Sequence, residues 1–242
     1  MKISFLIVIF NLFFYALHTN EPGKEYVVRL PQKKKIVEDN YGAIRRGDTT
    51  LKEIALVFTG DEFLEGIDPI IKTLKQNKIK ASFFLTGNAY RKFRNEIEKL
   101  RNEGHYLGAH SDKHLLYADW NKRDSTLVAE EIFLEDIKAN YSEMKKVGVG
   151  KKSAKYFLPA YEWYNADIVK WTEKFGLKLI NFTPGTRSNA DYTFPAMGDR
   201  YASSKDIFNS IIDFEEKNHS GLNGFILLLH AGAGPQRTDK FY

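Results

Sequence analysis

Residues 54–63 read IALVFTGDEF, an apolar run that ends in an acidic pair, Asp61 and Glu62. A run of this length and composition predicts a buried strand. Similar runs recur along the chain and helical patterns separate them, which indicates parallel strands joined by crossover helices. The predicted strands are 54–58, 81–85, 105–109, 155–158, 177–182 and 225–229.

Five helices are predicted between these strands, and the fold class is therefore α/β. Their ranges are 67–77, 95–104, 130–146, 165–176 and 205–217. The stretch from Glu21 to Lys52 has no clear periodicity, and we expect it to form a leading arm or an edge hairpin. With 242 residues the chain is long enough for one substantial core, and we assign residues 53–242 to a single domain and 20–52 to the leading arm.

The first residues, MKISFLIVIFNLFFYAL, place a lysine before an apolar run that ends near Leu17. This pattern is typical of a secretory signal and is short for a membrane span. We therefore assign residues 1–19 to a signal peptide and expect an exported protein with no stable membrane span after processing. An uncleaved anchor is the alternative, since no clear small-residue cleavage site follows.

Composition excludes several classes of function. There is no cysteine, so disulfides, thiolate metal sites and a cysteine nucleophile are all excluded. The net charge is +5, but lysines alternate with glutamates in helical patterns, which is typical of a solvated surface and not of a nucleic-acid-binding face. Any metal would have to use histidine and carboxylate ligands.

Polar residues that suit a metal follow three of the predicted strands. Asp61 follows the first strand, His110 and His114 follow the third, and His230 follows the last. In parallel β/α folds the loops after the strands form the active site, so these side chains are expected on one rim. One carboxylate and two imidazoles suit Zn²⁺ or another divalent ion and leave positions open for water and substrate.

From about Ile54 to His230 the sequence resembles the polysaccharide deacetylases of the NodB-homology type, which are metal-dependent carbohydrate esterases. The segment HSDKH matches the family motif H[ST]xxH, and LLH matches a late Leu-x-His motif. The resemblance implies a distorted, incomplete barrel of about six to seven parallel strands and an acetylated glycan as the substrate. It also implies metal ligands at Asp61, His110 and His114, most simply for Zn²⁺, an acetyl pocket lined by Leu228, and His230 as the general acid.

Two family features are missing. The family has two aspartates where this chain has Thr59 and Gly60, and an arginine where it has Leu158. In one hypothesis the protein is a working variant: Glu62 or metal-bound hydroxide is the base, and Arg187 replaces the lost positive charge. In the other hypothesis the protein is a catalytically impaired glycan-binding protein. Removal of a general base typically costs about 10²- to 10⁴-fold, so we favour the working variant.

The remaining site residues are weaker predictions. Asp191 loosely resembles a family aspartate that orients the general acid, and a loop-capping role is equally compatible with its sequence. Tyr161 and Trp163 follow the fourth predicted strand and suit either sugar stacking or packing. The chain ends at Tyr242, so we expect incomplete closure of the barrel unless the leading segment or a partner chain contributes a strand. The choice between N-acetyl and O-acetyl groups and the oligomeric state stay open.

Overall fold

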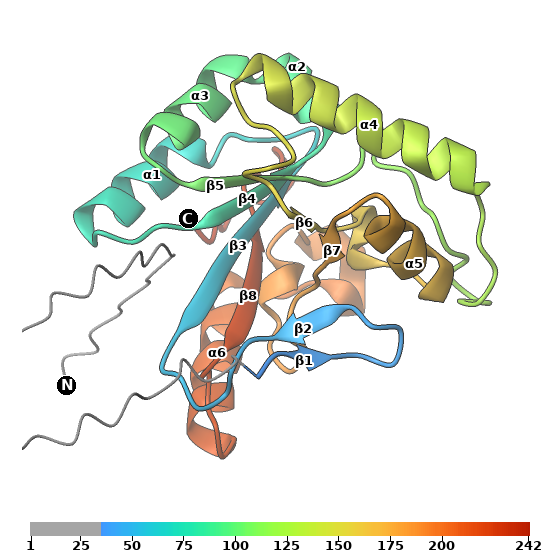
Figure 1. Cartoon of the computed structure of the whole chain (residues 1–242). Helices are drawn as coiled ribbons and strands as arrows, with labels where there is room; N and C mark the ends of the chain where they lie inside the picture. Colours follow the sequence, from blue (N-terminus) through green and yellow to red (C-terminus); the bar gives the residue numbers. More distant parts are fainter. Residues whose placement is uncertain (1–34) are drawn as a thin grey trace, which may run out of the picture.

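The computed structural model describes residues 35–242, and its centre is one curled, eight-stranded sheet (Figure 1). The strand order is β1-β2-β8-β3-β4-β5-β6-β7. The strands are β1 (Val37–Glu38), β2 (Ile44–Arg46), β3 (Ile54–Gly60), β4 (Ser82–Leu85), β5 (Tyr106–Ala109), β6 (Tyr156–Phe157), β7 (Lys178–Leu179) and β8 (Phe225–His230). The predicted signal peptide, 1–19, lies outside the described residues.

The six strands from β8 through β3 to β7 run parallel to one another. They coincide with the six strands expected from the sequence, so the predicted α/β fold with a distorted, incomplete barrel is confirmed. Strands β6 and β7 contain only two residues each, fewer than predicted. One reason for the early end of β6 is Pro159, which has no backbone N–H to continue a ladder of hydrogen bonds.

Helices pack against the outer face of the sheet (Figure 1). They are α1 (Ile67–Gln76), α2 (Gly87–Lys92), α3 (Arg94–Asn102), α4 (Glu130–Lys146), α5 (Ala166–Lys174) and α6 (Ser204–Lys217), with the 3₁₀ turns η1 (Ala160–Glu162), η2 (Ser188–Ala190) and η3 (Pro195–Arg200). Helix α2 was not predicted, because six residues are too few for a periodic pattern; the side chain of Thr86 caps it by accepting a hydrogen bond from the Ala89 N–H. Within residues 35–242, no helix has both the length and the apolar character that crossing a membrane requires.

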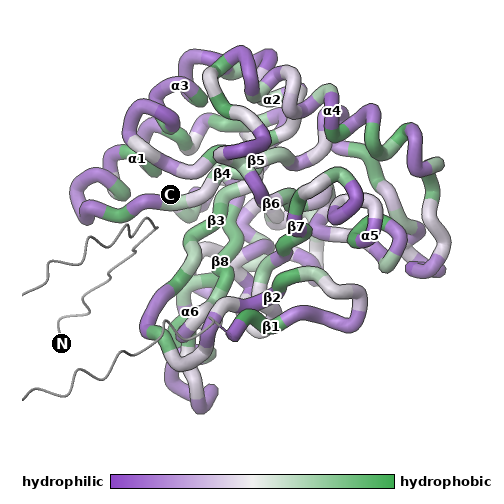
Figure 2. Tube along the Cα trace, viewed as in Figure 1, coloured by the Kyte–Doolittle hydropathy of each residue, from purple (hydrophilic) through white to green (hydrophobic). Residues whose placement is uncertain are grey.

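The strands bury both of their faces. Along β3, Phe58 packs in the large core between the sheet and the helices, whereas Val57 belongs to a smaller cluster inside the curve of the sheet. Successive side chains of a strand point to opposite faces, so a strand covered on both sides must be apolar throughout. Figure 2 shows this pattern in β3 and β8, which are hydrophobic over most of their length.

The hairpin β1–β2 connects the two ends of the parallel sheet. Strand β2 pairs antiparallel with β8 through Arg46 and Phe225. On the same edge of β2, opposite β1, Ile44 forms a bridge with Ile180, just after β7, and its carbonyl accepts a hydrogen bond of 2.9 Å from the Asn181 N–H. The leading segment therefore supplies the strand that lies between the two ends of the parallel sheet.

We expect the stability of the fold to depend on pH because of His105, the residue immediately before β5. Burial, with a smaller effect from Lys80, lowers the pKa of His105 to about 4, and its Nδ1 accepts a hydrogen bond of 3.2 Å from the Ala81 N–H. Between about pH 6.5 and 4, His105 is protonated in the unfolded chain but stays neutral in the folded chain. The free energy of unfolding is therefore highest above this window and decreases as the pH falls through it. The loss should be on the order of 2 kcal/mol.

Urea denaturation at pH 7 and pH 4.5 measures this loss. The variant His105→Asn keeps a hydrogen-bond acceptor but cannot titrate, so its stability should depend less on pH than that of the wild type. His219→Asn, at an exposed position, is the control and should behave as the wild type. An equal fall in stability for the wild type and His105→Asn would contradict the prediction.

Candidate active site

One rim of the sheet gathers most of the polar side chains that could do chemistry. It lies at the carboxyl ends of the parallel strands, as expected for this architecture. Asp61 follows β3, His110 follows β5, Glu162 lies in η1 after β6, and His230 is the last residue of β8. Hydrogen bonds, ring contacts and mutual charge effects on pKa connect these residues and their neighbours.

The loop that carries the two predicted histidines is held by one carboxylate. Asp136 of α4 accepts hydrogen bonds from the backbone N–H groups of Asp112 (2.8 Å) and Lys113 (3.2 Å). Ser111 and His114 have φ angles of 75° and 56°, a backbone conformation that few residues other than glycine adopt. The hydrogen bonds to Asp136 keep the loop in this strained conformation, which fixes the directions of both imidazoles.

His110 is a neutral imidazole with a defined tautomer. It is 2% exposed, and its Nδ1 lies 2.8 Å from the carbonyl oxygen of Leu158, to which it donates. Burial, together with the nearby His114, lowers the pKa of His110 well below its ordinary value. Because Nδ1 carries the proton, Nε2 presents a lone pair, and this atom lies 3.9 Å from Oε1 of Glu162. The ring of His114 lies 5.3 Å from that of His110.

His230 and Asp191 form a close pair. Nδ1 of His230 lies 2.6 Å from Oδ1 of Asp191, and the backbone N–H of His230 donates to Oδ2 over 2.8 Å. Burial alone lowers the pKa of His230, but the charge and hydrogen bond of Asp191 outweigh it and the pKa is raised. The carboxylate therefore fixes the ring orientation and favours the charged imidazole, which suits a proton donor.

Glu162 is a candidate site residue that the sequence analysis does not identify. Burial raises the pKa of this carboxyl to about 7; the charge of His230 opposes the rise and that of Asp191 adds to it. Glu162 and its neighbour Tyr161 have φ angles of 53° and 60°, so two successive residues adopt the left-handed conformation. This turn places the Glu162 side chain beside His110, where it is mostly buried.

A signal for Glu162 was present in the sequence. The loop PAYEWYN follows a predicted strand on the active rim, and Glu162 is its one acidic residue. The sequence predicts sugar stacking or packing for the aromatic residues of this loop but no role for Glu162, since nothing in the sequence reveals the left-handed turn that directs its side chain inward.

The predicted metal ligands have the right chemistry but are not assembled as a group. Two neutral imidazoles and a carboxylate match the ligand types of Zn²⁺. Oδ1 of Asp61 accepts a hydrogen bond of 2.5 Å from the Thr86 hydroxyl, and the charge of Asp61 partly offsets the lowering of the pKa of His114 by burial. In the part of the chain from residue 35 onward, no three histidine, aspartate or glutamate side chains are grouped so that they could hold a metal ion.

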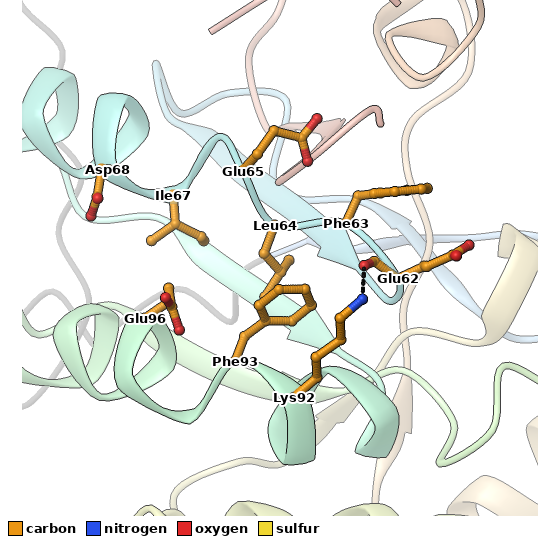
Figure 3. A pocket seen from close by; sticks show the side chains of 9 residues that line it. All are labelled: Glu62, Phe63, Leu64, Glu65, Ile67, Asp68, Lys92, Phe93 and Glu96. Carbon is orange, nitrogen blue, oxygen red and sulfur yellow. Dashed lines mark hydrogen bonds between the residues drawn. The ribbon is translucent and has the colours of Figure 1, made fainter. Parts of the chain in front are cut away.

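Two of the predicted site residues lie away from the histidines. Glu62 is exposed and lines a groove of about 320 Å³ on the outer side of the loop after β3, where Lys92 donates to its backbone carbonyl over 3.1 Å (Figure 3). The groove is lined by Glu62, Phe63, Leu64, Glu65, Ile67, Asp68, Lys92, Phe93 and Glu96. Arg187 is also exposed, and its guanidinium donates to the carbonyl groups of Arg200 and Tyr201.

The positions that depart from the family motifs are buried beside the site. Thr59, where the family has an aspartate, is 1% exposed, and its hydroxyl has no hydrogen-bond partner among the described residues. Leu158, where the family has an arginine, belongs with Leu228 to the cluster inside the curved sheet. Leu228 shares a face of β8 with His230, since the two are separated by one residue.

One of the two predicted aromatic residues borders the histidines, as does Tyr192, which was not predicted. The ring of Tyr161 lies 4.3 Å from that of His114. Trp163 is fixed by a hydrogen bond of 3.1 Å from its Nε1 to the carbonyl of Asp119. On the other side, the ring of Tyr192 lies 4.9 Å from that of His230.

Comparison with known proteins agrees with the resemblance read from the motifs. A family model described as polysaccharide deacetylase matches residues 46–180. A peptidoglycan-N-acetylglucosamine deacetylase of Bacillus cereus is 25% identical over 198 residues, which are 76% of this chain and 67% of that protein. For two further curated relatives, the matched part is about half of their own length.

Solved structures share the fold. A peptidoglycan N-acetylglucosamine deacetylase has a TM-score of 0.64 at 23% identity, with coverage of 81% of this chain and 79% of that chain. A CE4 family pseudoenzyme of Bacillus anthracis has a TM-score of 0.61 at 16% identity, with coverage of 79% of this chain and 59% of that chain. These similarities establish the arrangement of the strands and helices.

Proposed function

Because the chain belongs to the polysaccharide deacetylase family, we propose that it hydrolyses acetyl groups from an acetylated glycan. The observation that carries the proposal is the convergence of Glu162, His110 and the Asp191–His230 pair on one rim. Hydrolysis of an acyl group requires a base for the water and an acid for the leaving group, and these side chains have matching protonation states. The relatives named as peptidoglycan deacetylases make peptidoglycan the first substrate to test.

In the proposed reaction, Glu162 takes a proton from water while the water oxygen bonds to the acyl carbon. The protonated His230 then gives its proton to the leaving nitrogen or oxygen as the bond to the acyl carbon breaks, which releases acetate. Asp191 holds His230 in the orientation that this transfer needs. We propose that Leu228, on the same strand face, lines the pocket for the acetyl methyl group.

The base in this proposal is Glu162 in place of Glu62. Glu162 is mostly buried beside His110, and its pKa of about 7 is favourable for taking up a proton at neutral pH. Glu62 stays a prediction that a paired experiment tests. Arg187 also stays a prediction. Because it is exposed, we propose that it contacts a part of the glycan away from the reacting acetyl group.

We further propose that a divalent ion, most simply Zn²⁺, binds at His110 and His114 with Asp61 as the carboxylate ligand. The free Nε2 of His110 and the donor types support this assignment. When bound, such an ion supplies Lewis acidity toward the acyl carbonyl. Asp61 and His114 would have to move to coordinate it, since the described residues contain no assembled group of three ligands.

Export belongs to the proposal as well. A glycan of the cell wall lies outside the cytoplasm, and the apolar segment after Lys2 fits a secretory signal. The proposed substrate and the proposed location therefore agree.

A catalytically impaired glycan-binding protein is the second candidate. It is favoured by Thr59, Gly60 and Leu158, which stand where the family resemblance implies two aspartates and an arginine. In this case the rim binds acetylated sugars without turnover.

Acetate release from peptidoglycan and from acetylated chito- and xylo-oligosaccharides tests the proposal, with metal content measured on the same protein. Wild type should release acetate and contain about one metal ion per chain, and His114→Ala should lose that ion. Glu162→Gln should lower acetate release about 10²-fold, because the amide cannot accept the proton. The matched variant Glu62→Gln should stay within about threefold of wild type, consistent with a role outside the chemical step.

The opposite results have separate meanings. Binding of metal without acetate release from any substrate would favour the glycan-binding alternative. A larger loss in Glu62→Gln than in Glu162→Gln would assign the base to Glu62.

A further inference from the structure

An exposed row of aromatic rings extends outward from the histidines. Tyr161 contacts His114, and the ring of Trp120 lies 5.7 Å from that of Tyr161. Trp163 continues the row, 5.3 Å from Trp120. Tyr161 is 44% exposed and Trp120 is 52% exposed, so the row presents aromatic surface to solvent immediately beside the site.

The loop that carries Trp120 is braced on both of its sides. An isolated bridge joins Ala118 to Thr126, and the Asp119 carboxylate accepts hydrogen bonds from the N–H groups of Asn121 and Lys122. These contacts hold the backbone on either side of Trp120, although its indole is the largest exposed side chain of the loop.

Contacts from the segment between η1 and α5 also brace this loop. Trp163 donates to the Asp119 carbonyl, and the guanidinium of Arg123 lies 4.0 Å from the centre of the Trp163 ring. Arg123 also donates to the carbonyl of Tyr164 over 2.8 Å. The backbone around Trp120 and the Trp163 ring beside its indole are therefore held in place before any ligand arrives, which reduces the entropy that binding must otherwise cost.

We propose that Trp120 and Tyr161 form a binding subsite for a sugar next to the one that carries the reacting acetyl group. The inference rests on the proposed function and deepens it, because it assigns to Trp120 a contact with a second sugar of the substrate. An exposed aromatic ring suits the apolar C–H face of a pyranose, and ligand sites characteristically combine such rings with a few polar groups.

The position of Trp120 determines which sugar it contacts. Tyr161 adjoins His114 directly, whereas Trp120 is separated from His114 by the Tyr161 ring. The sugar at Trp120 is thus a neighbour in the chain of the sugar at the histidines. A single sugar bound at the histidines would not reach the indole.

Binding of N-acetylglucosamine and of its hexasaccharide, measured by calorimetry on the full chain, tests the subsite. Trp120→Ala should weaken binding of the hexasaccharide about three- to tenfold and leave that of the single sugar nearly unchanged. Phe208→Ala is the matched control, because Phe208 is an exposed aromatic residue of α6 (56% exposed) far along the chain from the loop. It should bind both sugars as wild type does.

Acetate release measured in parallel separates the two proposals. Release by wild type with equal hexasaccharide binding by wild type and Trp120→Ala would overturn the subsite and keep the proposed function. Binding that depends on Trp120, without acetate release, would keep the subsite and reject hydrolysis. Equal weakening for both sugar lengths, or no binding of the hexasaccharide by wild type, would overturn the subsite.

Discussion

Replacement of Asp191 by asparagine should lower kcat/KM for acetate release about 10³- to 10⁴-fold at neutral pH. In the wild type both carboxylate oxygens of Asp191 contact His230, one at the ring and one at the backbone. The asparagine oxygen can still accept from the backbone N–H, but its amide N–H₂ then faces the ring nitrogen. That arrangement favours the neutral imidazole with the wrong tautomer, and comparable exchanges behind a catalytic histidine cost about 10⁴-fold.

The pH profile gives a second readout of the same variant. Asp191 raises the pKa of His230, so the proton that the leaving group needs is retained to a higher pH. The rate should fall on the alkaline side when His230 loses that proton. In Asp191→Asn this alkaline limb should move to lower pH, because the negative charge that held the proton is gone.

A matched exchange provides the control for Asp191→Asn. Asp213→Asn removes an exposed aspartate of α6 that pairs with Lys217 at the surface, and it should change neither the rate nor the pH profile. If Asp191→Asn kept the wild-type rate and alkaline limb, the Asp191–His230 pair would have no part in proton transfer.

Replacement of Arg237 by methionine should destabilise the fold by about 3–5 kcal/mol. Arg237 is fully buried, and its guanidinium donates to the carbonyl groups of Thr193 (2.5 Å) and Ala202 (3.0 Å) and to the Ser204 hydroxyl (3.1 Å). Methionine fills similar space but leaves these buried acceptors without their donor. Breaking a buried, hydrogen-bonded charge network typically costs this much.

Urea unfolding monitored by circular dichroism measures the change. Arg200→Met, at an exposed arginine of η3, is the control and should alter stability by less than about 0.5 kcal/mol. Because Thr193 lies two residues after Asp191, Arg237→Met should also loosen the loop that orients His230. If Arg237→Met had the same free energy of unfolding as the wild type, the buried hydrogen bonds of Arg237 would make no net contribution to stability.

Most strands and helices of the fold can be predicted from local sequence patterns. The apolar runs of β3, β4, β5 and β8 and the 3.6-residue periodicity of α1 are strong because both depend on continuous burial along one segment. The positions of His110 and His230 followed from the rule that strand ends meet at one rim. These inferences need only the sequence near each residue.

Contacts between segments that are distant in the sequence cannot be predicted from such local patterns. The pairing of Ile44 with Ile180 joins segments whose own sequences are short and weakly periodic. The inward turn of Glu162 depends on two left-handed residues, a conformation that their side chains do not favour. Tertiary contacts select both features, and no local pattern encodes them.

The place of β8 between β2 and β3 has a consequence for the order in which the protein folds. Strand β3 emerges early in synthesis, but one of its two partners, β8, lies near residue 230. The sheet therefore cannot be completed until almost the whole chain is available, and contacts of such large sequence separation form slowly. Under the proposed export, a chain that completes its sheet this late would still be unfolded when its transport begins.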